Sequence, residues 1–512
     1  MSNFKLEPLA YFSTPGFAYD AALKFTGVKL ELLEDPCMYT MVERGIRGGI
    51  SQINLREASA NNELMENYDK NMPLVYLIYL DCNNLYGTSM IEKLPTGGFK
   101  WIEKLKQNEV IKFDLCDGYF HMSDIDLNDD IGYLLEVDIT IPEKIHDETN
   151  DMPLAAENLI VEEKMLSPFQ QAFPKYAKEA NKKLAPNMFK KKRYVTHARN
   201  LQFYEQMGAK INKVHKVMQF NQSNWLASYI NFNTAKRAES GTSFGKNYYK
   251  LMNNAVFGKS VENVRNRINV TLARTKKEAL KIASKINMMR SVTVNENKVV
   301  FEVKVEKLKL CKPIYVGMVI LDLSKLYMLE FHYKKMKKWF NNIQLCFSDT
   351  DSYLYRIEGV DMYKVIDEHK EYFDFSDYPK SHKCFSNQNK KRLGVYKDEL
   401  QGQIILQFIG LRAKSYSILY TDYKGKEREK QVSKGTKSAV RKRFLRHKKY
   451  EEVLLTMKKV CVNQNGILSV KHELGTYSQE RVALSGYDTK RYICICGKKT
   501  LAHGHYLTKT NC

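Results

Sequence analysis

The sequence predicts an α+β fold in which an antiparallel sheet carries acidic side chains at the ends of its strands. One observation is the unbroken apolar and aromatic run 74–80, typical of a strand covered on both faces, which ends at Asp81. Another is the alternating pattern over 343–349, which resumes at Tyr353 after a turn that contains Asp351. Carboxylates on adjacent strand ends of one sheet suit metal-assisted phosphoryl transfer.

Length and charge narrow the class of protein. A chain of 512 residues is too long for one compact core, which predicts two to four subdomains. An apolar content of 44%, with 12% aromatic residues, excludes a generally disordered chain. The 81 Lys and Arg residues outnumber the 58 Asp and Glu residues, for a net charge of +23. Such a surplus favours a polyanionic partner, most often nucleic acid; a merely basic, soluble protein is the alternative.

Targeting signals and cysteines add two expectations. No apolar run reaches the ~18 residues of a membrane span, and residues 1–20 lack a signal-peptide pattern. We therefore expect an intracellular protein with no membrane partner. The ten cysteines are scattered singly except for Cys494 and Cys496. Because no second pair lies at a suitable spacing, buried or free thiols are favoured over a zinc site.

Secondary-structure patterns can be followed along the rest of the chain. Residues 1–70 are mixed, with a helical pattern near 20–32, and residues 160–240 are basic and helix-prone. From about residue 420 the chain becomes strongly basic, which indicates a separate C-terminal module. The other predicted elements are a strand over 134–141, an amphipathic helix over 242–264, a Lys-rich helix near 275–286, strands at 291–294 and 299–305, and a helix near 322–342.

The predicted hairpin places two carboxylates close together at its tip. Asp349 and Asp351 are separated only by Thr350. Such crowding of like charges is unfavourable unless cations neutralise it. Two Mg²⁺ ions held with the help of Asp81 would do so, and would clamp the attacking and leaving oxygens of an in-line displacement. A polar turn that uses Asp and Ser in Asx-type hydrogen bonds is the alternative for the hairpin alone.

The predicted helix over 242–264 has one polar and one apolar face. Two of its lysines lie one turn apart, and lysines so placed are accommodated best when they share an anion such as a nucleoside triphosphate. A solvated helix face is the alternative. The polar face consists of Lys246, Lys250, Asn254 and Phe257, and the buried side is expected to consist of Phe244, Tyr248, Leu251, Met252 and Ala255.

Five short motifs, in order along the chain, resemble those of family B DNA polymerases, and specifically their protein-primed branch. They are Ile46-Arg-Gly-Gly49, Asp81-Cys-Asn-Asn-Leu-Tyr86, Lys250-Leu-Met-Asn-Asn-Ala-Val-Phe-Gly258, Ser348-Asp-Thr-Asp-Ser352 and Lys414-Ser-Tyr416. The resemblance implies a right-hand polymerase with an antiparallel palm sheet, helical fingers and a small thumb. It also implies a nucleotidyltransferase that is a DNA-directed DNA polymerase.

The resemblance implies roles for residues at the catalytic centre. Asp81 and Asp351 would bind two Mg²⁺ ions, for which Mn²⁺ can substitute, and Asp349 would assist as an outer carboxylate. Lys250 would hold the triphosphate together with Lys246, with Arg237 as a third candidate. The remaining implied nucleotide contacts are Tyr86, which would exclude a 2′-hydroxyl from the incoming sugar, and Asn254 and Phe257, which would contact the nascent base pair.

The resemblance also implies contacts with DNA. Lys414 and Tyr416, two residues apart on a predicted strand and hence on one face, would hold the primer terminus. Gly48 and Gly49 would let the backbone approach the template strand. The sequence departs from the family pattern without losing a metal ligand: Gly87 replaces a proline, Asn84 and Ala255 replace serines, and Ile46 and Phe257 replace tyrosines.

The motifs divide the chain into seven expected parts. Residues 100–240 and 265–340 are longer than a bare palm and fingers need, as in protein-primed relatives, whose insertions contact the priming protein and encircle DNA for processivity. Basic residues interleaved with Tyr194, Phe203 and Tyr204 suit the first insertion, although an ordinary amphipathic helix is equally consistent. The parts are an exonuclease remnant with a template-binding linker (1–70), palm with motif A (71–150), an insertion (151–225), fingers (226–265), a second insertion (266–320), palm with motif C (321–420) and thumb (421–512).

A proofreading exonuclease is not expected in this chain. The residues before Asp81 contain no Asp-x-Glu, and although Asp20 resembles the last exonuclease aspartate, an exposed helix residue explains it equally well. We expect the C-terminal polymerase portion of a longer protein. The expected partners are template and primer DNA, deoxynucleoside triphosphates and a terminal priming protein, for a monomer that replicates a virus or mobile element. Its substrate alone suggests the nucleus or a viral replication site.

Two other readings of the sequence stay open. A catalytically inactive DNA-binding relic of such an element would show a broken metal site, whereas Asp81, Asp351 and Lys250 are all present. Another palm enzyme, such as a reverse transcriptase or an RNA polymerase, is disfavoured by Tyr86 and by the Lys414-Ser-Tyr416 motif.

Overall fold

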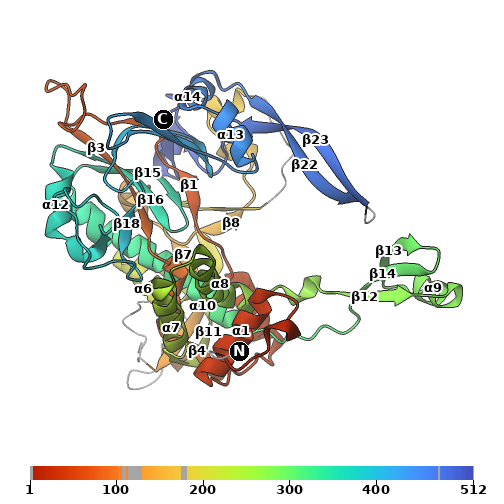
Figure 1. Cartoon of the computed structure of the whole chain (residues 1–512). Helices are drawn as coiled ribbons and strands as arrows, with labels where there is room; N and C mark the ends of the chain where they lie inside the picture. Colours follow the sequence, from red (N-terminus) through yellow and green to blue (C-terminus); the bar gives the residue numbers. More distant parts are fainter. Residues whose placement is uncertain are drawn as a thin grey trace.

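The computed structural model describes residues 4–102, 104–105, 111–112, 122, 130–173, 182–470 and 473–510. Parts of the predicted first palm segment and of the insertion at 151–225 lie outside these residues. The described chain forms a main body from which two narrow β-rich arms project on one side (Figure 1). No helix in the described ranges is both long and apolar enough to cross a bilayer.

A six-stranded sheet forms the centre of the main body. Its strand order is β1-β15-β16-β3-β18-β17, and every neighbouring pair is antiparallel except β17 and β18. The antiparallel sheet predicted from the sequence is therefore confirmed. The strands are β1 (Ser51–Ile53), β3 (Val75–Cys82), β15 (Ile343–Asp349), β16 (Ser352–Glu358), β17 (Phe373–Asp374) and β18 (Tyr396–Asp398).

Strand β3 is covered on both faces, as its continuous apolar pattern predicts. Its residues from Val75 to Leu80 are all buried. Tyr76, Ile78 and Leu80 belong to the core shared with the helices, whereas Leu77 and Tyr79 belong to a second core. That second core lies against a four-stranded sheet of β2 (Glu57–Ser59), β19 (Ile404–Arg412), β20 (Ser415–Thr421) and β21 (Glu427–Ser433).

A long helix packs in the first core. α10 (Ile314–Glu330) continues through the π-helical turn η6 (Phe331–Met336) into α11 (Lys337–Trp339). It therefore begins eight residues before the predicted start at 322. Nearly all residues of α10 are buried, so its first half is apolar all round and lacks the amphipathic period that marks a helix in a sequence. Smaller helices nearby are α2 (Pro36–Gly45), α3 (Leu85–Met90), α4 (His146–Thr149), α5 (Pro168–Gln171) and α12 (Met362–Glu368).

The predicted fingers segment forms two packed helices, α7 (Ala227–Glu239) and α8 (Ser243–Ser260), with α1 (Thr14–Thr26) packed against α8. Met252 and Ala255 are buried as predicted. The prediction is wrong for Phe244 and Leu251, which are 78% and 42% exposed. Most of the first turn of α8 is exposed, so a side chain there has nothing to pack against except its own helix.

The prediction that 160–240 is helix-prone is correct only in part. The segment contains α6 (Ala198–Gln206) and α7, but also two strands, β10 and β11, of a second four-stranded sheet ordered β10-β7-β11-β4. β11 contains bulges that place the buried Ile211, Val214 and Val217 three residues apart, a spacing that resembles a helix. The strands are β4 (Leu94–Trp101), β7 (Ile131–Thr140), β10 (Lys191–His197) and β11 (Lys210–Ser223).

The aromatic residues of that segment are part of the core. Tyr194, Phe203 and Tyr204 are each at most 4% exposed. They are therefore unable to stack on nucleic-acid bases, and the prediction that they interleave with lysines on a binding surface is wrong.

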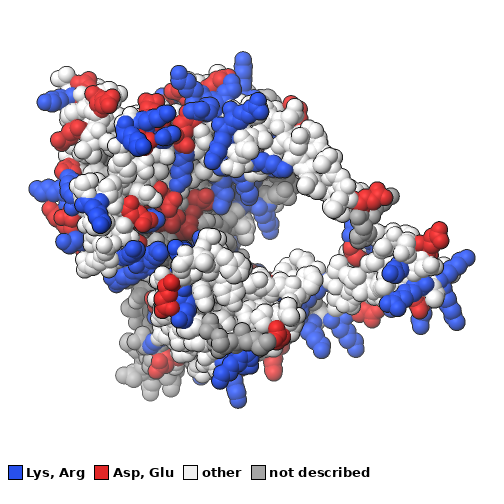
Figure 2. All heavy atoms as spheres, in the orientation of Figure 1, with Lys and Arg blue, Asp and Glu red and all other residues white. Residues whose placement is uncertain are grey.

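Two arms project from the main body toward a common open space (Figure 2). One arm consists of β12 (Ile268–Ala273), β13 (Met288–Asn295) and β14 (Lys298–Lys304), with α9 (Lys276–Ala283). The other is the hairpin of β22 (Val460–Val470) and β23 (Glu473–Leu484). Two helices, α13 (Ser438–Phe444) and α14 (His447–Thr456), precede this hairpin.

Three short strand pairs complete the described β-structure. They are β5 (Lys104–Leu105) with β6 (Ile111–Lys112), β8 (Glu157–Leu159) with β9 (Lys183–Ala185), and β24 (Tyr492–Ile493) with β25 (Thr500–Leu501).

The region around β24 and β25 returns to the edge of the central sheet. The Arg56 guanidinium donates to the Gly497 carbonyl at 2.9 Å, and the Thr500 hydroxyl donates to the Asn54 carbonyl at 2.7 Å. The backbone N–H of Ala502 donates to Asn150 Oδ1 at 2.8 Å. Segments more than 340 residues apart in sequence are thus joined beside β1.

The predicted seven-part division stays a prediction, and two sheet pairings cross its boundaries. β21 lies beyond residue 420 but pairs with β20. β1 lies within 1–70 but pairs with β15 in the central sheet.

Candidate active site

The two carboxylates singled out by the sequence meet at one end of the central sheet. Asp81 lies near the end of β3, directly opposite Ser352 at the start of β16. Asp351 lies in the turn just before Ser352, and its carbonyl accepts a hydrogen bond from the N–H of Cys82 at 2.7 Å. Antiparallel pairing therefore holds both residues at the same edge.

A cavity of about 200 Å³ opens at this edge. It is formed where the end of β3 and the start of α3 meet α7, α8 and the β15–β16 turn. Six predicted site residues converge on it from distant parts of the sequence. They are Asp81, Tyr86, Arg237, Lys250, Asn254 and Asp351, joined by Cys82, Asn83, Asn84 and Leu85.

Burial and mutual repulsion dominate the electrostatics of the two carboxylates. Burial raises the pKa of Asp81 to about 8, with further contributions from the charges of Asp351 and Glu399, while Lys430 and Lys250 act in the opposite direction. Burial also raises the pKa of Asp351, and the charge of Asp349 adds to it. The edge therefore holds carboxylates that are costly to ionise without a nearby cation.

This donor set fits Mg²⁺. Within the described residues no group of three or more His, Cys, Asp or Glu side chains could hold a metal ion. At this edge Asp81 and Asp351 would offer a metal ion two carboxylates. Mg²⁺ is usually bound by one or two carboxylates, with waters and substrate phosphates completing its coordination. Desolvated carboxylates that repel one another and face a cavity are what such an ion would stabilise.

Asp349 is engaged by a lysine. Lys414 Nζ lies 3.0 Å from Asp349 Oδ1. Lys414 is in the turn between β19 and β20, with φ of 61°, rather than on a strand. Tyr416 is 3% exposed, and its hydroxyl lies 3.2 Å from that of Tyr79. The prediction that both residues lie on a strand is therefore wrong for Lys414, which precedes β20. Both side chains nevertheless reach β15, because the Tyr416 ring stacks on Phe347 with centroids 4.4 Å apart.

Helices α7 and α8 supply the other wall of the cavity. Lys250 and Asn254 of α8 line it, and the Oδ1 atom of Asn254 is buried without a hydrogen-bond partner. Arg237 of α7 also lines it, whereas Lys246 is exposed and does not. The sequence periodicity places Lys246 correctly on the polar face but does not show that the cavity ends one turn short of it.

Two predicted nucleotide contacts touch each other. The rings of Tyr86 and Phe257 are stacked, with centroids 4.7 Å apart and planes 14° from parallel. Tyr86 belongs to α3 and Phe257 to α8, so the pair joins these two helices. Tyr86 lines the cavity, whose other lining groups are mostly polar, and Phe257 supports the Tyr86 ring without lining the cavity itself.

The two glycines of the first motif have different environments. A Cβ at Gly48 would meet no atom within 4 Å, whereas one at Gly49 would lie 2.4 Å from Cγ2 of Thr350. Thr350 has φ of 68°, and its N–H donates to the Ile50 carbonyl at 2.7 Å. Gly48 thus faces open space, as an approach to the template requires, and Gly49 makes room for the carboxylate turn. The spacing of residues in the sequence does not predict the close approach of Gly49 to Thr350.

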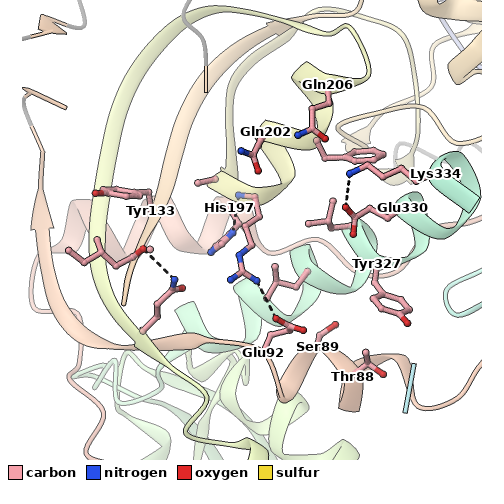
Figure 3. A pocket seen from close by; sticks show the side chains of 18 residues that line it. Thr88, Ser89, Glu92, Tyr133, His197, Gln202, Gln206, Tyr327, Glu330 and Lys334 are labelled. Carbon is pink, nitrogen blue, oxygen red and sulfur yellow. Dashed lines mark hydrogen bonds and ion pairs between the residues drawn. The ribbon is translucent and has the colours of Figure 1, made fainter. Parts of the chain in front are cut away.

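A larger cavity elsewhere in the molecule has a different character. It has a volume of about 560 Å³ and contains none of the predicted site residues. Its charged side chains are paired with one another: Arg199 with Glu92 at 3.2 Å and Lys334 with Glu330 at 2.9 Å (Figure 3). It offers no uncompensated charge for a nucleotide or metal ion.

The geometry can be compared with known proteins. No protein-family model matches the sequence, and no curated protein does either. Solved structures of Phi29 DNA polymerase do match the fold. The ternary complex with primer-template DNA and incoming nucleotide matches at a TM-score of 0.53 and 14% identity, over 93% of this chain and 68% of that one. The orthorhombic crystal form matches at a TM-score of 0.54 and 13% identity, over 91% of this chain and 68% of that one. The binary complex with primer-template DNA matches at a TM-score of 0.53 and 13% identity, over 92% of this chain and 68% of that one. The α+β polymerase fold expected from the sequence is therefore confirmed.

Proposed function

We propose that this chain is a template-directed DNA polymerase of family B that extends a primer with deoxynucleotides by two-metal phosphoryl transfer. The observation that carries the proposal is the single cavity at which Asp81, Asp351 and Lys250 converge with Arg237 and Tyr86. Carboxylates suited to divalent ions face cations suited to a triphosphate, on the fold of a known polymerase.

Each side of the cavity has its own task in the proposed reaction. Asp81 and Asp351 would hold two Mg²⁺ ions, which supply Lewis-acid stabilisation of phosphoryl oxygens. Lys250 and Arg237 would bind the triphosphate and stabilise the negative charge that develops on the leaving group. A bond forms between the primer hydroxyl oxygen and the α-phosphorus, the bond from this phosphorus to the bridging oxygen breaks, and pyrophosphate leaves. Lys246 lies too far along α8 for a direct role at the cavity.

The stacked rings provide the basis for substrate selection. Tyr86 would lie against the incoming sugar and exclude a 2′-hydroxyl, while Phe257 and Asn254 would contact the nascent base pair. The unpartnered Oδ1 of Asn254 offers an acceptor for this contact. Lys414 would meet a primer phosphate after release from Asp349, and Tyr416 would support the turn from within the core.

We further propose DNA and a priming protein as partners. Two of the three similar structures named above were solved with primer-template DNA, and the net charge of +23 favours a polyanion. The attacking hydroxyl would come from a primer 3′ end or from a priming protein, as in the protein-primed branch. The two arms beside the open space would enclose DNA. Replication of a virus or mobile element, by a monomer, is the setting that we propose.

Primer extension tests the proposal directly. The full chain is incubated with a short primer-template, Mg²⁺ and deoxynucleotides, beside Asp351→Asn and the exposed control Asp367→Asn. Extension by the wild type and the control but not by Asp351→Asn supports a polymerase with this metal site. Equal inactivity of all three proteins, with DNA binding retained, would favour the inactive relic. Ribonucleotides and RNA templates in parallel reactions distinguish the other palm enzymes.

A further inference from the structure

The turn that follows Asp81 has an unusual conformation at Asn84. Asn84 has φ of 53°, in the left-handed region, which asparagine tolerates better than most residues. Its Oδ1 accepts a hydrogen bond from the N–H of Gly87 at 3.3 Å, and its carbonyl accepts one from the N–H of Thr88 at 2.9 Å. Asn84 therefore caps α3 with both its side chain and its main chain.

Gly87 is required by the position of this capping side chain. A Cβ at residue 87 would lie 2.1 Å from Nδ2 and 2.6 Å from Cγ of Asn84, closer than real Cβ atoms approach any neighbour. All three nearest atoms to this Cβ belong to Asn84. Any other residue at position 87 would force Asn84 out of its capping position. Proline would in addition remove the N–H that bonds to Asn84.

The two departures from the family motif therefore explain each other. Asn84 stands where the motif has serine, and Gly87 stands where it has proline. Asparagine fits the left-handed conformation and reaches the cap, and glycine leaves the space that this side chain fills. Asparagine followed by proline would clash and lose the hydrogen-bond donor at residue 87, whereas serine followed by glycine would leave the space beside the turn unfilled.

The pair encloses the residue that the proposed function assigns to sugar selection. Tyr86 lies between Asn84 and Gly87 in the first turn of α3, and its ring stacks on Phe257. Asn84 and Tyr86 both line the cavity. A change in this turn would move the Tyr86 ring relative to the cavity without removing any group from it.

We propose that Asn84 and Gly87 are a coupled pair of positioning residues that sets the Tyr86 ring against Phe257 and thereby sets discrimination between deoxyribonucleotides and ribonucleotides. The role of the pair in selectivity rests on the proposed polymerase function. The steric coupling between the two residues does not depend on that function.

A double-mutant cycle tests the pair. The four proteins are the wild type, Gly87→Ala, Asn84→Gly and the double variant, because Asn84→Gly keeps the left-handed backbone while removing the side chain. Gly87→Ala is expected to lower the melting temperature by about 2 °C or more and the selectivity for deoxyribonucleotides by about 10- to 100-fold. In the Asn84→Gly background the same alanine is expected to cost little in either measurement. Gly241→Ala is the matched control, since a Cβ there meets nothing within 4 Å.

A swap to the family residues provides a second measurement. Asn84→Ser with Gly87→Pro is expected to retain more selectivity than Gly87→Pro alone, because the shorter serine side chain vacates the space that a Cβ at residue 87 would enter. If the effects of Gly87→Ala and Asn84→Gly on the melting temperature are additive in the double variant, the inference is overturned whether or not the protein is active. Coupling in melting temperature without coupling in selectivity, in an active wild type, overturns the positioning role. An inactive wild type with coupled melting temperatures contradicts the proposed function and the role in selectivity, while the steric pair stands.

Discussion

The central sheet and helix α8 contribute to one cavity by different means. In the sheet, hydrogen-bond register places Asp81 opposite Ser352, so that Asp351 in the adjoining turn has little freedom of position. In α8, the helical period defines a face but not how much of that face reaches the cavity: Lys250 lines it, and Lys246 one turn earlier does not. The register of paired strands determines where a residue lies along the sheet, whereas helical periodicity determines only which face of the helix it occupies.

The two regions also differ in charge. The sheet contributes buried carboxylates whose pKa values are raised mainly by burial. The helices contribute the cations Lys250 and Arg237. Each region is electrostatically incomplete without a ligand, and a metal-bound triphosphate would satisfy both. The following predictions change one region at a time.

Removing the Asp81 charge is expected to abolish activity while stabilising the metal-free protein. The pKa of Asp81 is about 8 in the folded chain, above its unfolded value of about 3.9, so the folded state retains a proton that the unfolded state has lost. Wild-type stability should therefore fall as the pH rises from about 4 to 8, and Asp81→Asn should escape this loss. We expect a gain in the free energy of unfolding of about 2 kcal/mol at pH 8 and less at pH 5.

Urea denaturation in EDTA at both pH values measures this difference, with Asp367→Asn, an exposed acid on α12, as the control. Adding Mg²⁺ should reduce the advantage of Asp81→Asn. An advantage of equal size at pH 5 and pH 8 would show that the sheet does not hold a strained carboxylate.

A matched pair of lysine variants probes the helix. Lys250→Met is expected to raise the KM for deoxynucleotides by about 10- to 100-fold, because a charge-assisted contact with the triphosphate is lost. Lys246→Met removes the same charge from an exposed position on the same face and should change KM by less than about threefold. Steady-state primer extension measures both. Equal effects would mean that the whole polar face binds the nucleotide.

The smallest expected effect concerns the turn beside Asp349. Lys414→Met should weaken primer binding and reduce the slope of log K against log salt by about one, as for the loss of one phosphate contact. Tyr416→Phe should leave that slope unchanged and lower the free energy of unfolding by about 1 kcal/mol, because only a buried hydroxyl pair is lost. Fluorescence anisotropy at several salt concentrations separates the two. A changed slope in Tyr416→Phe would place its hydroxyl on DNA.

The sequence was sufficient to predict features set by local pattern. The apolar run 74–80 predicts strand β3, and the alternating pattern around Asp351 predicts strands β15 and β16 with the turn between them. The prediction that these strands lie in one sheet is confirmed by the pairing of β3 with β16. On α8 the spacing placed Lys250 and Asn254 on the face that lines the cavity and Met252 and Ala255 on the buried side, but it was wrong for Phe244 and Leu251. The order of motifs predicted the polymerase fold, although the roles of individual residues stay predictions.

Other features depend on contacts that no local pattern records. Bulges in β11 give Ile211, Val214 and Val217 a helix-like spacing, so the strand was predicted as helix. The positive φ of Lys414 places it in the turn before β20 rather than on the strand, which an even spacing of two does not indicate. The exposure of Phe244 follows from where the neighbouring helices end. In each case the missing information is tertiary.

The hydrogen bonds that join residues 491–502 to the edge of the central sheet have a consequence for synthesis on the ribosome. Arg56, Asn54 and Asn150 emerge early, but they find their partners only after residues 497–502 have been made. The bonded residues lie at least 352 positions apart, so at about 5–20 residues per second roughly 18 seconds or more separate the two events. During that interval these three residues lack these native hydrogen-bond partners, so the speed of late translation should influence the yield of folded protein.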